Sequence, residues 1–122
     1  MRTLNYVLLA VREPGKSAQL YTRLLGREPV ENSPTFVLYV LPTGLKVGLW
    51  QADEIEPKPL PAGGVELSFT EDSREAVDAT HDECRRLGLR IVQEPTAMDF
   101  GYTFVAEDPD GHRLRPFVPA ER

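Results

Sequence analysis

The stretch that decides the fold is residues 4–11, LNYVLLAV, because residues 64–70, GVELSFT, repeat its pattern in the second half of the chain. Each stretch predicts a β-strand, and each is followed by a pattern typical of a helix that ends at a glycine, Gly26 or Gly88. Each half then closes on a predicted hairpin. A unit of this size that occurs twice indicates one supersecondary unit in two copies.

Strand, helix and three further strands are expected in each half. The helices are predicted at residues 17–25, after a break at Pro14 and Gly15, and at residues 73–87, with Ser73 as the N-cap. The remaining strands are expected at residues 27–31, 35–41 and 45–51, and at residues 89–93, 102–107 and 112–118.

This order predicts an α+β fold of two βαβββ modules. We expect one domain over residues 1–122, with modules at 1–52 and 64–122 and a linker at 53–63 that holds three prolines and several acidic residues without periodicity. Two half-barrels of this kind enclose a cavity between them. The function is therefore expected on the strand faces that line this cavity.

Composition excludes several functions. The 122 residues carry a net charge of −5, which argues against a nucleic-acid or anionic-membrane partner. Cys84 is the only cysteine, so no disulfide can form within the chain, and we interpret it as an ordinary helix residue. The sequence shows no signal peptide and no apolar run of 18 residues, and a cytoplasmic protein is expected.

Two motifs resemble the vicinal oxygen chelate superfamily, which includes glyoxalase I, bleomycin-resistance proteins and extradiol dioxygenases. Residues 17–26, SAQLYTRLLG, are similar to the first helix of that family, and residues 108–112, DPDGH, are similar to its last hairpin. Gly111 suits the tight turn of that hairpin, because glycine accepts a positive φ. The resemblance covers essentially the whole chain and implies a glyoxalase-like fold.

Metal-dependent members of this superfamily hold a divalent ion with four side chains. The resemblance maps these positions to Tyr6, Gly48, Glu66 and Arg115. A phenol is a poor ligand at neutral pH, glycine has no side chain, and arginine has no lone pair to offer. A shift of one residue in the mapping brings in only poorer ligands. We therefore expect no metal, no cofactor and no catalytic residue.

The two histidines offer no replacement. His81 is expected on the solvated face of the second helix, and His112 is expected to have a structural role in the last turn.

Strand alternation predicts the side chains that line the cavity. The strand at residues 35–41 is apolar on both faces, and we choose Phe36 and Leu38 as its cavity-facing residues. Phe100 and Tyr102 are added because their segment resembles phenazine-resistance proteins. The predicted ligand-binding set is Tyr6, Phe36, Leu38, Gly48, Trp50, Glu66, Ser68, Phe100, Tyr102 and Arg115. The same alternation places Leu8, Ala10, Thr70, Arg113 and Phe117 on this face, and Val65, Leu67 and Phe69 beneath the second helix.

Two of these residues have alternative interpretations. Trp50 could belong to the core or could stack on a ligand, for which Gly48 would leave space. Arg115 lies between apolar neighbours and needs a counter-charge, either Glu66 or a carboxylate of the ligand.

Within the superfamily, the chain resembles the phenazine-antibiotic resistance proteins. The shared features are a Gly-Leu-Trp strand end at Trp50, the acidic proline linker and the segment that leads into Phe100. The resemblance implies a homodimer, with or without exchange of modules, that holds a planar aromatic antibiotic without chemistry. Two alternatives remain open: a metal-dependent lyase, isomerase or dioxygenase with a displaced ion near Glu66 and His112, and a structural or regulatory module without a ligand.

Overall fold

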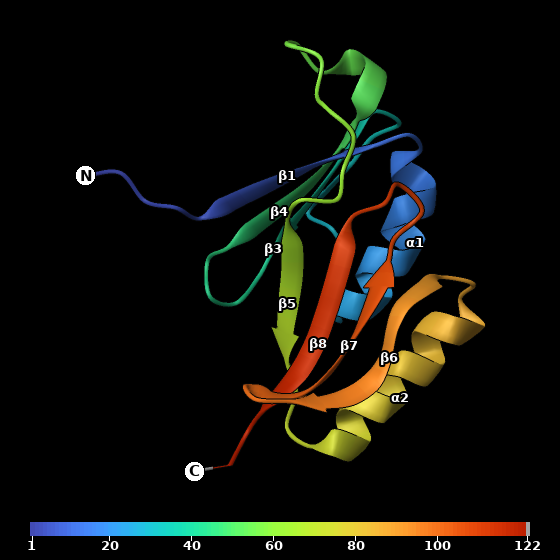
Figure 1. Ribbon diagram of the computed structural model, residues 1–122. Helices are drawn as coiled ribbons and strands as arrows, with labels where there is room; N and C mark the ends of the chain where they lie inside the picture. Colours follow the sequence, from blue (N-terminus) through green and yellow to red (C-terminus); the bar gives the residue numbers. More distant parts are fainter. Residues whose placement is uncertain (122) are drawn as a thin grey trace. The chain divides into compact units, whose positions relative to one another are not determined.

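The computed structural model describes residues 1–121 and shows two compact units, Met1–Leu60 and a second unit that begins at Pro61 (Figure 1). Each unit holds one four-stranded sheet and one α-helix of at least twelve residues. The predicted α+β class, with strand, helix and three strands in each half, is confirmed.

The first unit begins with an edge strand and a crossover helix. Its elements are β1 (Tyr6–Val11), α1 (Pro14–Leu25), β2 (Glu31–Asn32), β3 (Phe36–Val40) and β4 (Lys46–Gln51), followed by a short 3-10 helix at Ala52–Glu54. The strand order is β1-β4-β3-β2. β1 pairs with β4 in parallel, whereas β3 pairs antiparallel with both β4 and β2.

The second unit repeats this topology. Its elements are β5 (Glu66–Thr70), α2 (Arg74–Arg86), β6 (Arg90–Met98), β7 (Gly101–Glu107) and β8 (Arg113–Pro119), in the strand order β5-β8-β7-β6. β5 pairs with β8 in parallel and β7 pairs antiparallel with β6 and β8. In both units the helix therefore crosses over from an edge strand, and the last strand returns beside that edge strand.

Three element boundaries differ from the prediction by more than two residues. Pro14 does not break the chain but occupies the first turn of α1, where its missing N–H leaves no hydrogen bond unmade. β2 is only two residues long. β6 continues through Pro95 to Met98. Its pairing with β7 shifts in register on either side of Gln93, and such irregular pairing allows a proline within a strand.

The helix ends follow the sequence closely. Gly26 adopts the left-handed conformation, with φ of 68°, and its N–H donates to the Thr22 carbonyl. At the start of α2, the Ser73 hydroxyl accepts from the Ala76 N–H at 3.1 Å, as the capping pattern predicts.

The core of the first unit lies between α1 and its sheet. Tyr21, Val37, Tyr39 and Leu49 are completely buried there. The Tyr39 hydroxyl donates to the Ala18 carbonyl at 3.1 Å, and burial raises the pKa of this phenol. The sheet face toward α1 is thus fully packed.

The core of the second unit lies between α2 and the sheet, where Val77, Phe104 and Leu114 are buried. Burial also raises the pKa of the Cys84 thiol to about 11, which keeps it protonated and agrees with a structural role. Val65 was expected in this core, but it precedes β5 and is 71% exposed.

His81 is a further correction, because it does not lie on a solvated face. It is 9% exposed and packs edge-on against the Phe104 ring, with 5.3 Å between the ring centroids. Its Nε2 atom lies 2.8 Å from a carboxylate oxygen of Glu94. The position follows from helical spacing, since His81 is four residues after Val77 and three before Cys84, on the buried stripe of α2.

Across residues 1–121, neither helix has the length and apolar character that crossing a bilayer requires.

Candidate functional site: the open faces of the two sheets

The sheet face opposite α1 in the first unit is apolar and partly accessible. Alternation turns Val37 and Tyr39 toward α1, so Phe36 and Leu38 lie on the opposite side, as predicted. We call this surface the apolar face; it consists of Tyr6, Leu8, Phe36, Leu38, Gly48 and Trp50. Tyr6 and Leu8 are 38% and 52% exposed.

Gly48 lies at the middle of the apolar face, but the space above it is already occupied. A Cβ atom at this position would lie 2.8 Å from Cδ2 of Leu8 and 3.1 Å from the ring of Phe36. The expectation that this glycine leaves room for a ligand is therefore wrong. The glycine instead lets the side chains of the two neighbouring strands close over β4 and form a continuous apolar floor.

Trp50 lies at the end of this floor, beside Ala10 of β1 and Phe36 of β3 in the sheet register. Its side chain is neither fully buried nor fully exposed. It is therefore not a core residue of the first unit taken alone, and its stacking role stays a prediction.

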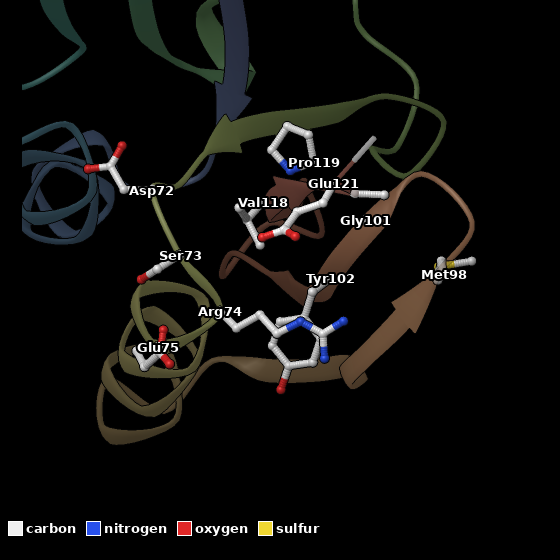
Figure 2. A pocket seen from close by; sticks show the side chains of 11 residues that line it. Asp72, Ser73, Arg74, Glu75, Met98, Gly101, Tyr102, Val118, Pro119 and Glu121 are labelled. Carbon is white, nitrogen blue, oxygen red and sulfur yellow. The ribbon is translucent and has the colours of Figure 1, made fainter.

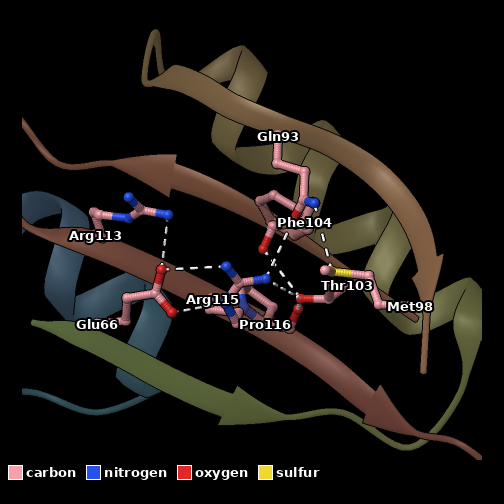
Figure 3. A network of polar contacts seen from close by, with 8 residues as sticks. All are labelled: Glu66, Gln93, Met98, Thr103, Phe104, Arg113, Arg115 and Pro116. Carbon is pink, nitrogen blue, oxygen red and sulfur yellow. Dashed lines mark hydrogen bonds and ion pairs between the residues drawn. The ribbon is translucent and has the colours of Figure 1, made fainter. Parts of the chain in front are cut away.

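The corresponding face of the second unit is charged. Glu66 and Arg115 come from the neighbouring parallel strands β5 and β8. The Arg115 Nε donates to one Glu66 oxygen at 2.7 Å and its Nη2 donates to the other at 3.2 Å (Figure 3). The predicted pairing of these residues is thus confirmed, and it is bidentate.

A second arginine shares the same carboxylate. Nη2 of Arg113 lies 2.8 Å from Oε2 of Glu66. We call Glu66, Arg113 and Arg115 the arginine cluster. The hydrogen bond from Arg115 is the main cause that lowers the pKa of Glu66, while partial burial opposes it, so the side chain is a carboxylate at neutral pH.

Gln93 and Thr103 support the arginine cluster and were missed in the sequence. Nη1 of Arg115 donates to the side-chain amide oxygen of Gln93 at 3.2 Å and to the Thr103 hydroxyl at 3.5 Å. The polar Thr103 next to the apolar run Phe104–Ala106 was a signal that could have found it. Gln93 gave no such signal, because a register shift in β6 decides its orientation.

Aromatic rings border the arginine cluster. The Phe100 and Phe117 rings meet edge to face, with 6.1 Å between their centroids. The Arg115 guanidinium lies 5.9 Å from the Phe100 centroid. Phe100 is 43% exposed, and Ser68, which pairs with Arg115 in the register, is also exposed. This part of the predicted set is therefore brought together.

Tyr102 lies elsewhere, on the sheet side that faces α2. Its hydroxyl donates to Asp78 at 2.7 Å, which raises the pKa of the phenol, and the Arg74 guanidinium lies 4.8 Å from its ring centroid. It lines a separate pocket of 540 Å³ (Figure 2). Phe100 is in the turn before β7, so alternation along the strand does not place Tyr102 on the same side.

The four positions that the resemblance maps to metal ligands do not fit a divalent ion. Gly48 has no side chain, and its surroundings are filled by Leu8 and Phe36. Arg115 presents a cation, and both oxygens of Glu66 are already bound by guanidinium groups. Within residues 1–121, no three His, Cys, Asp or Glu side chains gather in a way that could hold an ion.

Residues 3–115 match the Glyoxalase/Bleomycin resistance protein/Dioxygenase superfamily. The protein belongs to this family, and the resemblance seen in the sequence is confirmed. The chain is also 27% identical over 116 residues to the phenazine antibiotic resistance protein EhpR of Enterobacter agglomerans, a match that covers 93% of this chain and 89% of EhpR.

Solved structures agree with this assignment. The protein ATC0852 of Agrobacterium tumefaciens is 44% identical, with a TM-score of 0.90, over 99% of this chain and all of that one. A glyoxalase-related enzyme from Fulvimarina pelagi has a TM-score of 0.86 at 18% identity, over 97% of this chain and 88% of its own. The glyoxalase-like fold predicted from the sequence is therefore confirmed.

Proposed function

We propose that this protein binds a small planar aromatic antibiotic or metabolite and protects its host by holding the compound without reacting with it. The observation that carries the proposal is the arginine cluster. The Arg115 guanidinium, at a position that the resemblance maps to a metal ligand, binds both oxygens of Glu66, the one carboxylate of the mapped set. The similarity to a phenazine antibiotic resistance protein supports the same conclusion.

The apolar face supplies the contact area that a flat ligand needs. Phe36, Leu38 and Trp50 are all partly accessible on one side of a rigid sheet. Aromatic rings stack favourably on such surfaces, because burial of their faces removes a large apolar area from water. Stacking on an apolar surface does not depend on one particular ring system. A protein of this kind could therefore bind several related aromatic compounds.

Trp50 provides the test, since it is the only tryptophan in the chain. We expect phenazine and other planar aromatic compounds to quench its fluorescence saturably. A saturated ring of similar size, such as decalin, is the control compound and should have no effect. Absence of a saturable response across the aromatic panel would contradict the proposal.

Metal content separates this function from an enzyme of the same superfamily. Protein purified without chelator should contain far less than one equivalent of Fe, Mn, Zn or Ni. A nearly stoichiometric content of one of these metals would favour the metal-dependent alternative.

The proposed assembly is a homodimer, with or without exchange of modules between the copies. Tyr6 and Leu8 leave an apolar surface accessible on β1, the edge strand of the first sheet, and such edges are usually covered in stable proteins. Light scattering at micromolar concentration should give the mass of a dimer. A monomer mass would refute this assembly but not the binding function.

A further inference from the structure

We propose that the ligand carries a negative charge, a carboxylate or a comparable anionic group on its aromatic ring system, and that Arg113 and Arg115 bind this group. The inference rests on the proposed function, which specifies only that the ligand is planar and aromatic. It follows from the charge, the hydrogen-bonding capacity and the position of the arginine cluster.

The arginine cluster holds more positive than negative charge. Two guanidinium groups share the single carboxylate of Glu66, at 2.7 Å from Arg115 and 2.8 Å from Arg113. The neighbouring ion pair, Arg90 with Glu107 at 2.9 Å, is balanced and does not alter this excess. One positive charge therefore remains, on a chain whose net charge is −5.

The arginine cluster also has more hydrogen-bond donors than acceptors. Each guanidinium presents five N–H groups. Gln93 presents its carbonyl oxygen to Arg115, because its amide nitrogen contacts the sulfur of Met98 at 3.5 Å. The Thr103 hydroxyl gives its own proton to the Pro116 carbonyl. Nevertheless, Nε of Arg113 is buried and has no hydrogen-bond partner anywhere in residues 1–121.

The arginines are accessible enough to meet a ligand. The side chains of Arg115 and Arg113 are 18% and 32% exposed, and Figure 3 shows both directed toward Glu66 on one side of the sheet. Phe100, with its ring near Arg115, offers an aromatic surface next to the charge. A ring that packs against Phe100 would bring an attached carboxylate close to the guanidinium groups.

A structural ion pair would not need this arrangement. One arginine is sufficient to satisfy Glu66, and a second partly buried guanidinium costs desolvation energy unless another anion compensates it. An anionic ligand supplies that compensation. The excess positive charge of the arginine cluster can also attract an anion.

Calorimetric titration with phenazine-1-carboxylate, phenazine-1-carboxamide and phenazine tests the proposal. The acid and the amide have nearly the same shape and differ in charge. We expect the acid to bind at least about tenfold more tightly than the amide, because charge-assisted hydrogen bonds are stronger than neutral ones. Added salt should weaken binding of the acid and leave that of the amide nearly unchanged.

Two matched variants change the charge of the arginine cluster in opposite directions. Arg113→Gln removes the excess charge but leaves the bidentate pair intact, and it should lower the acid-to-amide affinity ratio toward one. Glu66→Gln frees both guanidinium groups and should raise that ratio. If Glu66 only maintained the fold, Glu66→Gln would instead weaken the binding of the acid and of the amide equally. A urea titration of each variant confirms folding, and Glu66→Gln alone still decides the question if Arg113→Gln does not fold.

The outcomes distinguish the two proposals. Equal affinities for the acid and the amide, without a response to salt or to either variant, would overturn the anionic ligand and leave the binding function standing. If none of the three compounds binds, both proposals fail.

Discussion

The two sheets pair their strands in the same way, but the side chains on their open faces differ. In the first unit, Leu8 pairs with Gly48 and Ala10 with Trp50; at the same places in the second unit, Ser68 pairs with Arg115 and Thr70 with Phe117. The last strand of each unit therefore carries an aromatic residue, Trp50 or Phe117, near its end on the open face. Two residues earlier, however, a glycine stands in one unit and an arginine in the other.

The sides that face the helices do not differ in this way. Leu49 on β4 and Leu114 on β8 are both buried under a helix. A helix against a sheet tolerates little beyond apolar side chains, whereas an open face can change without loss of the fold. The comparison indicates that the helix side maintains each module, whereas the open side can differ between the modules.

The largest expected effect tests this division. Leu49→Ala should destabilise the protein by about 2–5 kcal/mol, because it leaves a cavity under α1. Leu38→Ala is the matched control on the neighbouring strand, and it should cost less than half as much, since Leu38 is only partly buried. Urea unfolding measures both. Equal costs would show that another surface covers the apolar face in solution, and the division would then need revision.

A smaller effect is expected at Trp50. Trp50→Ala should weaken binding of phenazine by at least about 0.5–1.5 kcal/mol, because an aromatic contact typically contributes this much beyond its buried area. The fluorescent signal is lost with this residue, so calorimetry is the measurement. A variant that unfolds, or one that binds as tightly as the original protein, would place Trp50 in the core and outside the site.

The smallest effect is the pH dependence that Glu66 confers. Its pKa in the folded protein is lower than the ordinary value of 4.5, so its carboxylate stabilises the fold above that pH. This contribution should disappear as the pH falls from 4.5 through the lower pKa of the folded state. For a partly exposed group it should amount to less than about 1 kcal/mol.

The stability difference between the original protein and Glu66→Gln, measured by urea unfolding from pH 7 to pH 3, should therefore shrink at acidic pH. A constant difference would mean that Glu66 makes no such contribution. Gln51→Glu offers a control, because it adds an acid to the first unit, which holds no residue of the arginine cluster.

The repeat, the fold class and the Glu66–Arg115 pair could be predicted from the sequence. Strand alternation and helical spacing are local properties, so they identify the side chains that share a face. The pair followed from charge and strand alternation together, because a partly buried arginine needs a carboxylate and Glu66 was the nearest acid on the same face.

Other features depend on geometry that no local pattern encodes. Tyr102 was assigned to the same set as Phe100. Phe100 lies in the turn before β7, however, and the Tyr102 side chain lies on the other side of the sheet, toward α2. The orientation of Gln93 depends on a register shift in β6, and that of His81 on the side of α2 that meets the sheet.

The sequence by itself determined the two βαβββ units, their helix caps and the side chains that share the open face of each strand, because these depend on residue type and spacing along one strand or helix. Only the tertiary structure decided that Leu8 and Phe36 close the space over Gly48 and that Arg113 joins Arg115 on a single carboxylate. Both outcomes depend on the distances between side chains of neighbouring strands, which the pairing of the strands sets and the sequence of one strand does not contain.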